Sequence, residues 1–462
     1  MLKSFFGDKH FYKKVLALAL PIMLQNGITN FVNMLDNLMV GSLGIGQSAG
    51  VNIAGQLLFV FNLCMFGAIS GAGIFGAQFY GKGDNKGLTY AFRFKLIVSL
   101  LIGALGIGLF YFLSDPLINI YLQSEGGAID PAFVFSQAKS YLQIMLIGLL
   151  PFALTQCYSG TLRECGRPTL PMIAGTVAVL VNLVFNYVLI FGNFGAPELG
   201  VRGAAVATVI SRFVELVIVV IFAHARTKKT PFMKDVFKSL YIPKTLVFAI
   251  TAKTIPLMAN EVVWATGMAT INKFYSERGI EVVAANNVLQ TFFNVFSVAY
   301  MAVGMSLGIL LGQKLGETTH KPTVMDYCKK LITTSVLVNT VMGVFFFIGA
   351  FFIPSLYNFE GNESARALAT QLMQVCAVMM PFEAMSHAMY FTLRSGGKTL
   401  ITFLFDSGYV WVIDVLAAAL LVRFTSVDII YIYLIVQILN ALRCALGYIF
   451  VKRGSWIRNI VE

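Results

Sequence analysis

Long runs of apolar residues, separated by short polar connections, recur along the whole chain. A helix needs about 20 mostly apolar residues to cross a bilayer, and about twelve runs are long enough. They cover 15–41, 51–80, 92–113, 135–158, 169–192, 203–225, 246–272, 282–313, 331–353, 368–392, 399–422 and 428–451. The runs are continuously apolar instead of alternating, which argues against a membrane β-barrel. The pattern therefore predicts an all-α polytopic membrane protein with about twelve transmembrane helices.

The composition agrees with a membrane protein. Of the 462 residues, 57% are hydrophobic and only 12% are charged, whereas soluble domains carry about 25% charged residues. The net charge is +12, but Lys and Arg lie at the ends of the apolar runs and not in a stripe, so nucleic acid is not an expected partner. The six cysteines show no spacing typical of a zinc site or a disulfide framework.

The basic residues predict the orientation of the chain. Both termini and the even-numbered connections carry most of the 34 Lys and Arg residues. The odd-numbered connections carry Arg202, Lys273, Arg278, Arg366 and Arg423. Because cytoplasmic loops are enriched in Lys and Arg, both termini are expected in the cytoplasm. An even number of spans leads to the same expectation.

The two halves of the chain resemble each other. LPIMLQNGITNFVN, from Leu20, is echoed by IPLMANEVVWATGM, from Ile255; YSGTLRECGRPTL, from Tyr158, is echoed by YFTLRSGGKTL, from Tyr390. The echoes lie six spans apart, which predicts a parallel repeat of two six-helix bundles around a central cavity, with alternating access as the mechanism.

The basic segment near residue 226 separates the two halves. We expect an N-terminal bundle at 1–225, a cytoplasmic linker at 226–245 and a C-terminal bundle at 246–462. The segment also fits an ordinary positively charged cytoplasmic loop.

Asp36 is the acidic residue of the first apolar run. A carboxylate at membrane depth costs on the order of 2.5–3.5 kcal/mol, so such residues usually face a protein-lined or water-filled site. Asp36 is thus a candidate cation ligand. The alternative is that it lies near the membrane surface and is simply hydrated.

Several motifs together resemble one transporter family. They are Pro21, Asp36 and Gly41 in the first run, GTLRECGRPTLPM from Gly160, NLVFNYVLIFG from Asn182, PELGVRGAAVAT from Pro197 and LRSGGKT from Leu393. In order and spacing the chain resembles the multidrug and toxic compound extrusion (MATE) transporters of bacteria, over nearly its whole length. The resemblance implies a secondary transporter that exports substrates in exchange for Na+ or H+.

The resemblance also implies a cation-coupling site in the N-terminal half. Its members here are Asp36, Asn182, Asn186 and Thr208. Asn182 and Asn186 are four residues apart, so they share a helix face, and a set of hard oxygen donors suits a small cation. Beyond a Na+ held by these residues, no metal and no cofactor are expected. The same residues could instead form a polar network that only joins two helices.

A second group of acids lies in the predicted C-terminal spans. It comprises Glu261, Glu383, Asp406 and Asp414, as ligands for a coupling cation or for the substrate. Glu383 matches an acidic position of the family, whereas Glu261 lies about three residues, nearly one turn, earlier than expected. Asp406 and Asp414 are eight residues apart and so share a helix face. Alternatively, Asp406 forms an ion pair with Lys398 or Arg394 at the cytoplasmic end.

The function expected from these residues is antiport of amphipathic cationic compounds against Na+ or H+, in the cell membrane, by a monomer. A lipid-linked oligosaccharide flippase of the same superfamily is the alternative; it would need cations in its cavity, for which Lys139, Arg212 and Arg443 are the candidates within spans. An intramembrane enzyme is the third class, but no catalytic constellation or P-loop is present in the sequence. His387 lies four residues after Glu383 without a third ligand, so a zinc site is not expected.

Overall fold

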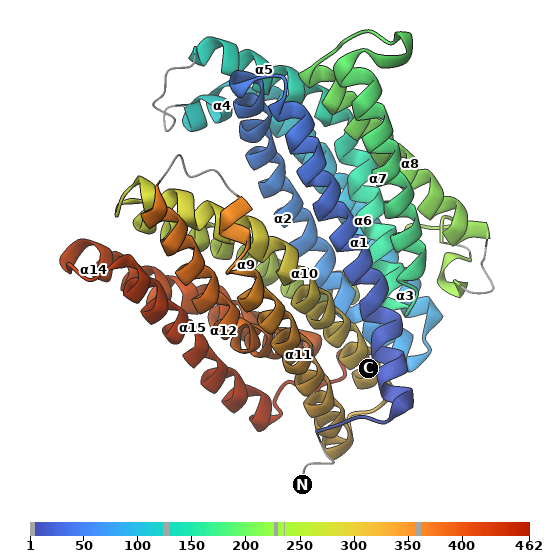
Figure 1. Cartoon of the computed structure of the whole chain (residues 1–462). Helices are drawn as coiled ribbons and strands as arrows, with labels where there is room; N and C mark the ends of the chain where they lie inside the picture. Colours follow the sequence, from blue (N-terminus) through green and yellow to red (C-terminus); the bar gives the residue numbers. More distant parts are fainter. Residues whose placement is uncertain (1–4, 123–129, 226–229, 235, 357–361) are drawn as a thin grey trace. The chain divides into compact units, whose positions relative to one another are not determined.

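A computed structural model gives the fold of residues 5–122, 130–225, 230–234, 236–356 and 362–462 (Figure 1). All regular elements in these ranges are helical. The α-helices are α1 Lys9–Gly41, α2 Ile45–Lys82, α3 Asn85–Phe112, α4 Ser114–Leu122, α5 Pro131–Met145, α6 Leu149–Glu164, α7 Thr169–Phe191, α8 Val201–Ala225, α9 Lys244–Ser276, α10 Ile280–Glu317, α11 Lys321–Gly349, α12 Glu363–Ser395, α13 Thr399–Phe403, α14 Leu416–Phe424 and α15 Ile429–Arg453. Short helices are η2 Leu146–Gly148, η3 Asn193–Gly195, η4 Pro231–Met233 and η5 Ile353–Leu356, and two π-helices are η6 Leu404–Gly408 and η7 Val410–Val415.

The prediction of an all-helical membrane protein is confirmed. In the described part of the chain, 11 helices or helix pairs are long and apolar enough to cross a membrane. The remaining expected span corresponds to α12, whose 33 residues are long enough but include charged side chains such as Glu383 and Arg394. Most of its second half is buried by neighbouring helices, so these polar groups do not need to face lipid.

Several helices begin at a residue with a capping side chain. The carboxylates of Asp84, Asp130 and Asp428 and the amide oxygen of Asn362 accept hydrogen bonds from backbone N–H groups at the starts of α3, α5, α15 and α12. These bonds satisfy donors that a helix start leaves unpaired. The helices accordingly extend beyond the apolar runs seen in the sequence, and α4 is a short helix that the apolar pattern did not predict.

The chain divides into two compact units. The C-terminal unit contains Met1–Met23, Ala77–Gly83 and Ile255–Glu462; the N-terminal unit contains Leu24–Gly76 and Asp84–Thr254. The helices α1, α2 and α9 therefore each contribute residues to both units.

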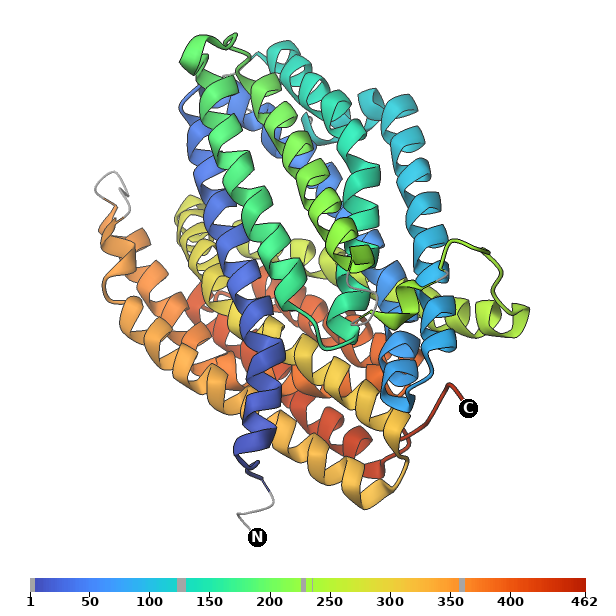
Figure 2. The ribbon, with the colours of Figure 1, turned by 90° about the vertical axis from the view of Figure 1, so that its right-hand side faces the viewer.

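In the N-terminal unit, α7 and α8 pack side by side along their length (Figures 1 and 2). Gly203 of α8 permits a close approach, because a Cβ atom there would lie 2.4 Å from the carbonyl oxygen of Leu189. Small residues at helix contacts are typical of membrane bundles. A buried apolar cluster joins α2, α5 and α6, with Met65, Leu142 and Leu149 at its centre.

In the C-terminal unit, α12 packs against α10, α11 and α15. Gly304 and Gly308 of α10 leave room for the ring of Phe391 on α12. The first turns of α1 belong to this unit, since Phe11, Val15 and Leu18 pack in the same buried cluster as α10 residues such as Leu311.

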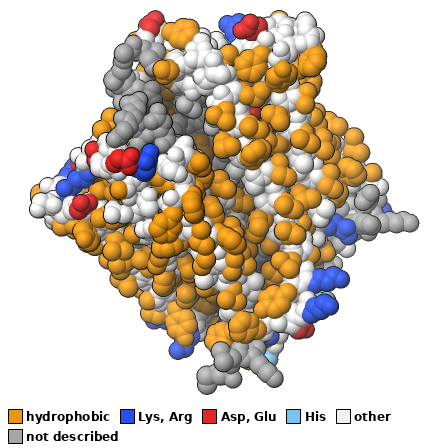
Figure 3. All heavy atoms as spheres, viewed as in Figure 1, with side chains coloured by type: hydrophobic (Ala, Val, Ile, Leu, Met, Phe, Trp, Pro, Cys, Tyr) orange, Lys and Arg blue, Asp and Glu red, His pale blue; other side chains and the backbone are white. Residues whose placement is uncertain are grey.

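Large hydrophobic side chains cover much of the helix surface that Figure 3 shows. Leu105 is 70% exposed and Phe248 is 77% exposed, although both belong to long apolar helices. Such exposure is costly in water but favourable against lipid, as expected for membrane-spanning helices.

Part of the predicted linker at 226–245 can be examined. Residues 226–229 and 235 lie outside the described residues. Beyond them, Phe232 and Met233 are buried. The hydroxyl of Thr89 on α3 donates to the carbonyl of Phe232 at 3.0 Å, and Nε of Arg93 donates to the carbonyl of Val236 at 2.9 Å. This part of the linker therefore packs against α3.

Candidate functional site

The four residues expected to form the N-terminal site lie together. Nδ2 of Asn186, on α7, donates to Oδ1 of Asp36, on α1, at 2.6 Å. Asn182 lies one turn before Asn186, and its amide hydrogen-bonds both Asp36 and Thr208 when its nitrogen faces Asp36. In that orientation the nitrogen lies 2.9 Å from Oδ2 and 3.1 Å from Oδ1, and the amide oxygen accepts from the Thr208 hydroxyl at 3.3 Å.

Burial differs among these four residues. Asn182 and Asn186 are 6% and 1% exposed, whereas Asp36 and Thr208 are half-buried. Oδ1 of Asn186 is shielded and has no hydrogen-bond partner in the described structure. The site thus combines a carboxylate, two amides and a hydroxyl, with one buried acceptor oxygen still unused. The amides of Asn186 and Asn182, which donate to Asp36, are neutral.

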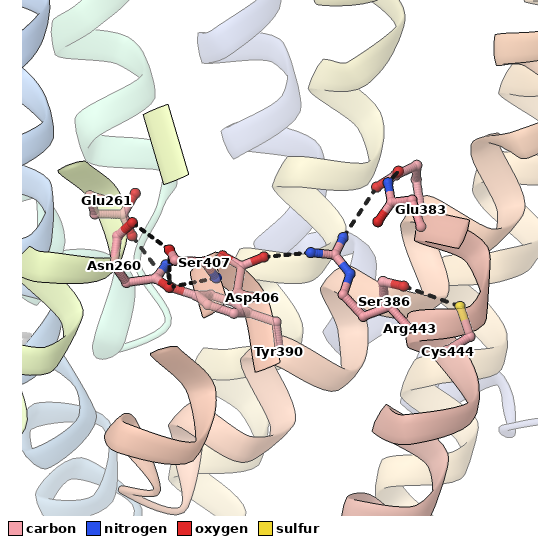
Figure 4. A network of polar contacts seen from close by, with 10 residues as sticks. Asn260, Glu261, Glu383, Ser386, Tyr390, Asp406, Ser407, Arg443 and Cys444 are labelled. Carbon is pink, nitrogen blue, oxygen red and sulfur yellow. Dashed lines mark hydrogen bonds and ion pairs between the residues drawn. The ribbon is translucent and has the colours of Figure 1, made fainter. Parts of the chain in front are cut away.

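The acids of the C-terminal unit have a different partner. Nη1 of Arg443, on α15, donates to Oδ1 of Asp406, in η6, at 2.7 Å. Nδ2 of Asn260, on α9, donates to the other oxygen of Asp406 at 3.0 Å. Figure 4 shows Asp406 between these two partners. The alternative for Asp406, an ion pair with Lys398 or Arg394 at the cytoplasmic end, is wrong about the partner, since the pair is with Arg443 in the interior of the unit.

Glu383 lies on the opposite side of the same guanidinium group (Figure 4). Nη2 of Arg443 lies 3.7 Å from Oε2 of Glu383, and the amide of Asn440 donates to Oε1 of the same carboxylate in a short hydrogen bond. Glu261 is at the other end of the network and accepts a hydrogen bond from the hydroxyl of Tyr390 at 3.4 Å. The four acids are therefore not equivalent, because only some of them contact Arg443.

Asp414 is the most deeply buried of the four acids, with 3% exposure. Its Oδ1 atom has no hydrogen-bond partner in the described residues. Asp406 and Asp414 lie in two successive π-helices, whose hydrogen bonds span five residues, so the 3.6-residue period used for their shared face does not hold here. Both carboxylates nevertheless interact electrostatically with Arg443.

The neutral partners in this network carried little signal in the sequence. Asn260 also accepts a hydrogen bond from the Ser407 hydroxyl at 2.7 Å, and Tyr390 and Asn440 lie on helices distant in the sequence. The useful signal was Arg443 itself, a cation within an apolar run. A second buried ion pair was missed: in the N-terminal unit, Nζ of Lys95 lies 2.5 Å from Oε2 of Glu164.

His387, four residues after Glu383, lies among aromatic side chains. Its ring packs edge-on against Tyr300, with ring centres 4.9 Å apart, and stacks near Tyr390. Among the described residues, no group of three or more His, Cys, Asp or Glu side chains is arranged to hold a metal ion. The N-terminal site is not of that type, since three of its four members are amides or a hydroxyl.

Comparison with known proteins identifies the family. The sequence profile of the MatE family matches residues 21–188 and again residues 256–419. The chain belongs to the MatE family. The two matches fall in the two halves that resemble each other, which agrees with the predicted repeat. MatE proteins are multi-pass membrane transporters and not enzymes.

Two curated MatE relatives have related names. The chain is 28% identical over 455 residues to a probable multidrug resistance protein NorM of Thermotoga maritima, covering 97% of this chain and 94% of the relative. It is 24% identical over 321 residues to the multidrug resistance protein NorM of Vibrio cholerae, covering 68% and 67%.

Solved structures confirm the MatE fold. A multidrug resistance MATE family transporter in an outward-facing conformation gives a TM-score of 0.85 at 17% identity, with 98% of both chains covered. A MOP superfamily transporter from Pyrococcus furiosus, described as having a binding pocket of reverse polarity that suggests a different function, gives 0.84 at 17% identity and the same coverage.

Proposed function

We propose that this MatE protein is a secondary active multidrug efflux transporter that exchanges amphipathic cationic compounds for Na+ or H+ by alternating access. The observation that carries the proposal is the Asp36 carboxylate, which receives hydrogen bonds from the amides of Asn186 and Asn182. A carboxylate with these neutral partners can take up a mobile cation.

The same residues suit both coupling ions. For Na+, the oxygens of Asp36, Asn182, Asn186 and Thr208 would supply hard ligands of the type that such a cation prefers. For H+, a protonated Asp36 would donate a hydrogen bond to a neighbouring oxygen, and the buried Oδ1 of Asn186 is an acceptor without a partner. One carboxylate can thus alternate between a charged and a neutral state.

The names of the relatives support several drugs as substrates, and the acidic side chains support a cationic one. The NorM proteins of Thermotoga maritima and Vibrio cholerae are named for multidrug resistance. Deep acids, with aromatic neighbours such as Tyr390, would attract a flat organic cation.

A flippase for lipid-linked oligosaccharides is less well supported. Such a protein needs free cations to hold phosphate, but Arg443 pairs with Asp406 and Lys139 pairs with Asp115. Arg212 donates to the carbonyl of Gly148 and lies over the ring of Phe152. The three candidate cations are therefore already engaged.

The remaining expectations belong to this proposal. We place the protein in the cell membrane as a monomer, with both termini in the cytoplasm and two six-helix lobes at 1–225 and 246–462 joined by the segment 226–245. Cysteine labelling from either side of the membrane, at positions introduced next to the termini, would test the orientation.

Efflux of ethidium from proteoliposomes tests the proposal. A Na+ gradient and an H+ gradient are imposed separately on the wild type and on Asp36→Asn. Efflux driven by one gradient in the wild type and lost in the variant is expected. Asp115→Asn is the matched control, because Asp115 lies on the short helix α4 with an exposed side chain. Equal gradient-driven efflux by wild type and Asp36→Asn would refute the role of Asp36.

A further inference from the structure

Arg443 is a cation in the interior of a membrane bundle. It lies in the middle of the apolar helix α15 and is only 3% exposed. A guanidinium group at such a position is tolerated only when it faces other protein groups that compensate its charge. Its position therefore depends on the acids around it.

Two carboxylates contact this guanidinium group, and a third, Asp414, lies in η7, which also packs against α15. Asp406 and Glu383 lie 2.7 Å and 3.7 Å from its nitrogens, and Asp414 interacts with it electrostatically. Glu383 comes from α12, and the two aspartates come from η6 and η7. Arg443 thus occupies the position, among the acids, that a bound cation would take.

Apart from Glu261 and Arg394 at the edge of the network, the other groups near these acids are neutral or weakly basic. Asn260 and Asn440 donate to Asp406 and Glu383, and the His387 ring lies nearby between Tyr300 and Tyr390. Tyr275 and Tyr409 interact with Asp414, and Arg394 interacts with Glu261 at the edge of the network.

We propose that Arg443 is a resident cation of the C-terminal unit, which holds the place of a mobile cation among Asp406, Glu383 and Asp414. The inference rests on the proposed function, because it concerns how many coupling cations the transporter takes up. Without Arg443, the three acids would have mostly neutral neighbours, as Asp36 has in the N-terminal unit. They would then take up a proton or a sodium ion that the wild type does not bind.

Cation binding by purified protein tests this inference. The double variant Asp36→Asn with Arg443→Met is compared with its parent, the single variant Asp36→Asn. Replacing Arg443 by Met removes the charge and keeps a long side chain. Binding of radioactive Na+ at fixed pH detects sodium, and uptake of acid by the unbuffered protein detects protons. The variant is expected to bind about one cation more per molecule than its parent, since one guanidinium charge has been removed.

Two further variants separate a charge effect from a general disturbance. Arg443→Lys keeps the positive charge and is expected to show no additional cation. Adding Asp406→Asn to Arg443→Met removes the acid in closest contact with Arg443, and the gain should disappear. No gain in Arg443→Met, or the same gain in Arg443→Lys, would overturn the proposal.

Loss of folding in Arg443→Met would also be informative. Because a cation that binds only the folded state stabilises it by mass action, Na+ or acid pH should then restore folding, whereas choline should not. If neither Na+ nor acid restores it, the proposal is wrong. The inference and the proposed function can fail separately. If Asp36→Asn alone binds as many cations as the wild type, the proposed function is contradicted. The difference in cation binding between Arg443→Met and its parent, Asp36→Asn, tests the role of Arg443.

Discussion

The two units of this protein both place a carboxylate inside a helix bundle, but they give it different partners. Asp36 in the N-terminal unit receives hydrogen bonds from the amides of Asn186 and Asn182. Asp406 in the C-terminal unit has one amide partner, Asn260, and one guanidinium partner, Arg443. The first carboxylate thus has neutral amide partners, whereas the second has a counter-charge that the chain itself supplies.

The difference shows why the residue type alone does not identify a coupling site. A buried charge that loses its only counter-charge costs about 3–5 kcal/mol, but a whole buried ion pair can often be replaced by neutral side chains at little cost. Neutralising Asp36 should therefore abolish export, whereas neutralising Asp406 together with Arg443 should leave most of the export intact.

The largest expected effect is on transport. Asp36→Asn should reduce gradient-driven export to the background level, because the variant has no charge to exchange. The neutral double variant Asp406→Asn with Arg443→Met should retain most of the export, because it removes a charge and its counter-charge together. The export activity of both variants is measured as the resistance of cells to ethidium, at matched protein levels in the membrane. Loss of export in the double variant to the same level as in Asp36→Asn would remove the distinction between the two units.

The next largest effect is on stability in the C-terminal unit. Asp406→Asn alone should destabilise the protein by about 3 kcal/mol, near the low end for a broken buried pair, since Glu383 remains close to Arg443. Arg443→Met should recover most of this loss when added to Asp406→Asn. Thermal unfolding of the purified single and double variants in detergent measures the interaction free energy between Asp406 and Arg443. Additive losses in the double variant would contradict the ion pair.

A smaller effect is expected from the amides around Asp36. Asn186→Ala removes the 2.6 Å hydrogen bond to the carboxylate and an oxygen that could contact the cation. Hydrogen bonds to charged groups contribute about 1.5–3 kcal/mol, so the cation concentration for half-maximal export should rise roughly tenfold or more. Asn193→Ala is the matched control, because Asn193 lies in η3, beyond the end of α7, and its side-chain amide donates to the carbonyl of Tyr187. An unchanged cation dependence in Asn186→Ala would exclude the amide from the site.

The smallest effect concerns an exposed ion pair of the C-terminal unit. Glu277 lies just beyond α9, and the hydrogen bonds from Arg423 lower the pKa of its carboxyl group. A lowered folded-state pKa gives stability that is present above the unfolded value of about 4.3 and is lost as the pH falls through the folded value. Glu277→Gln should therefore lose slightly less thermal stability than the wild type on acidification below about pH 4, with export unchanged at neutral pH. If Glu277→Gln changed the thermal stability as much as Asp406→Asn, the exposed pair Glu277–Arg423 would matter as much as the buried pair Asp406–Arg443, which would contradict this expectation.

Much of the N-terminal site was accessible from the sequence. Asn182 and Asn186 are four residues apart, which placed them on one face of a helix. Asp36 was identified as a candidate because it is a charged residue within an apolar run. The family resemblance supplied the pairing of these helices, which periodicity alone could not give.

The network around Arg443 could be predicted only in part. The sequence showed the acids and the arginine in separate runs, but the pairing of Asp406 with Arg443 depends on how α15 packs beside η6. The two π-helices were also hidden, because the apolar run at 399–422 does not distinguish a π-helix from an α-helix. Neutral partners such as Asn260 carry no charge signal, so they could not be distinguished from other polar residues in the spans.

Competition between cations and substrate at equilibrium tests the central role of Asp36 most directly. Ethidium binding to the purified wild type and to Asp36→Asn would be measured over a range of Na+ concentrations and, separately, of pH. Because linked sites affect each other reciprocally, Na+ or acid should weaken ethidium binding to the wild type, and binding to Asp36→Asn should be independent of both. The same cation dependence in the two proteins would show that the coupling cation binds elsewhere.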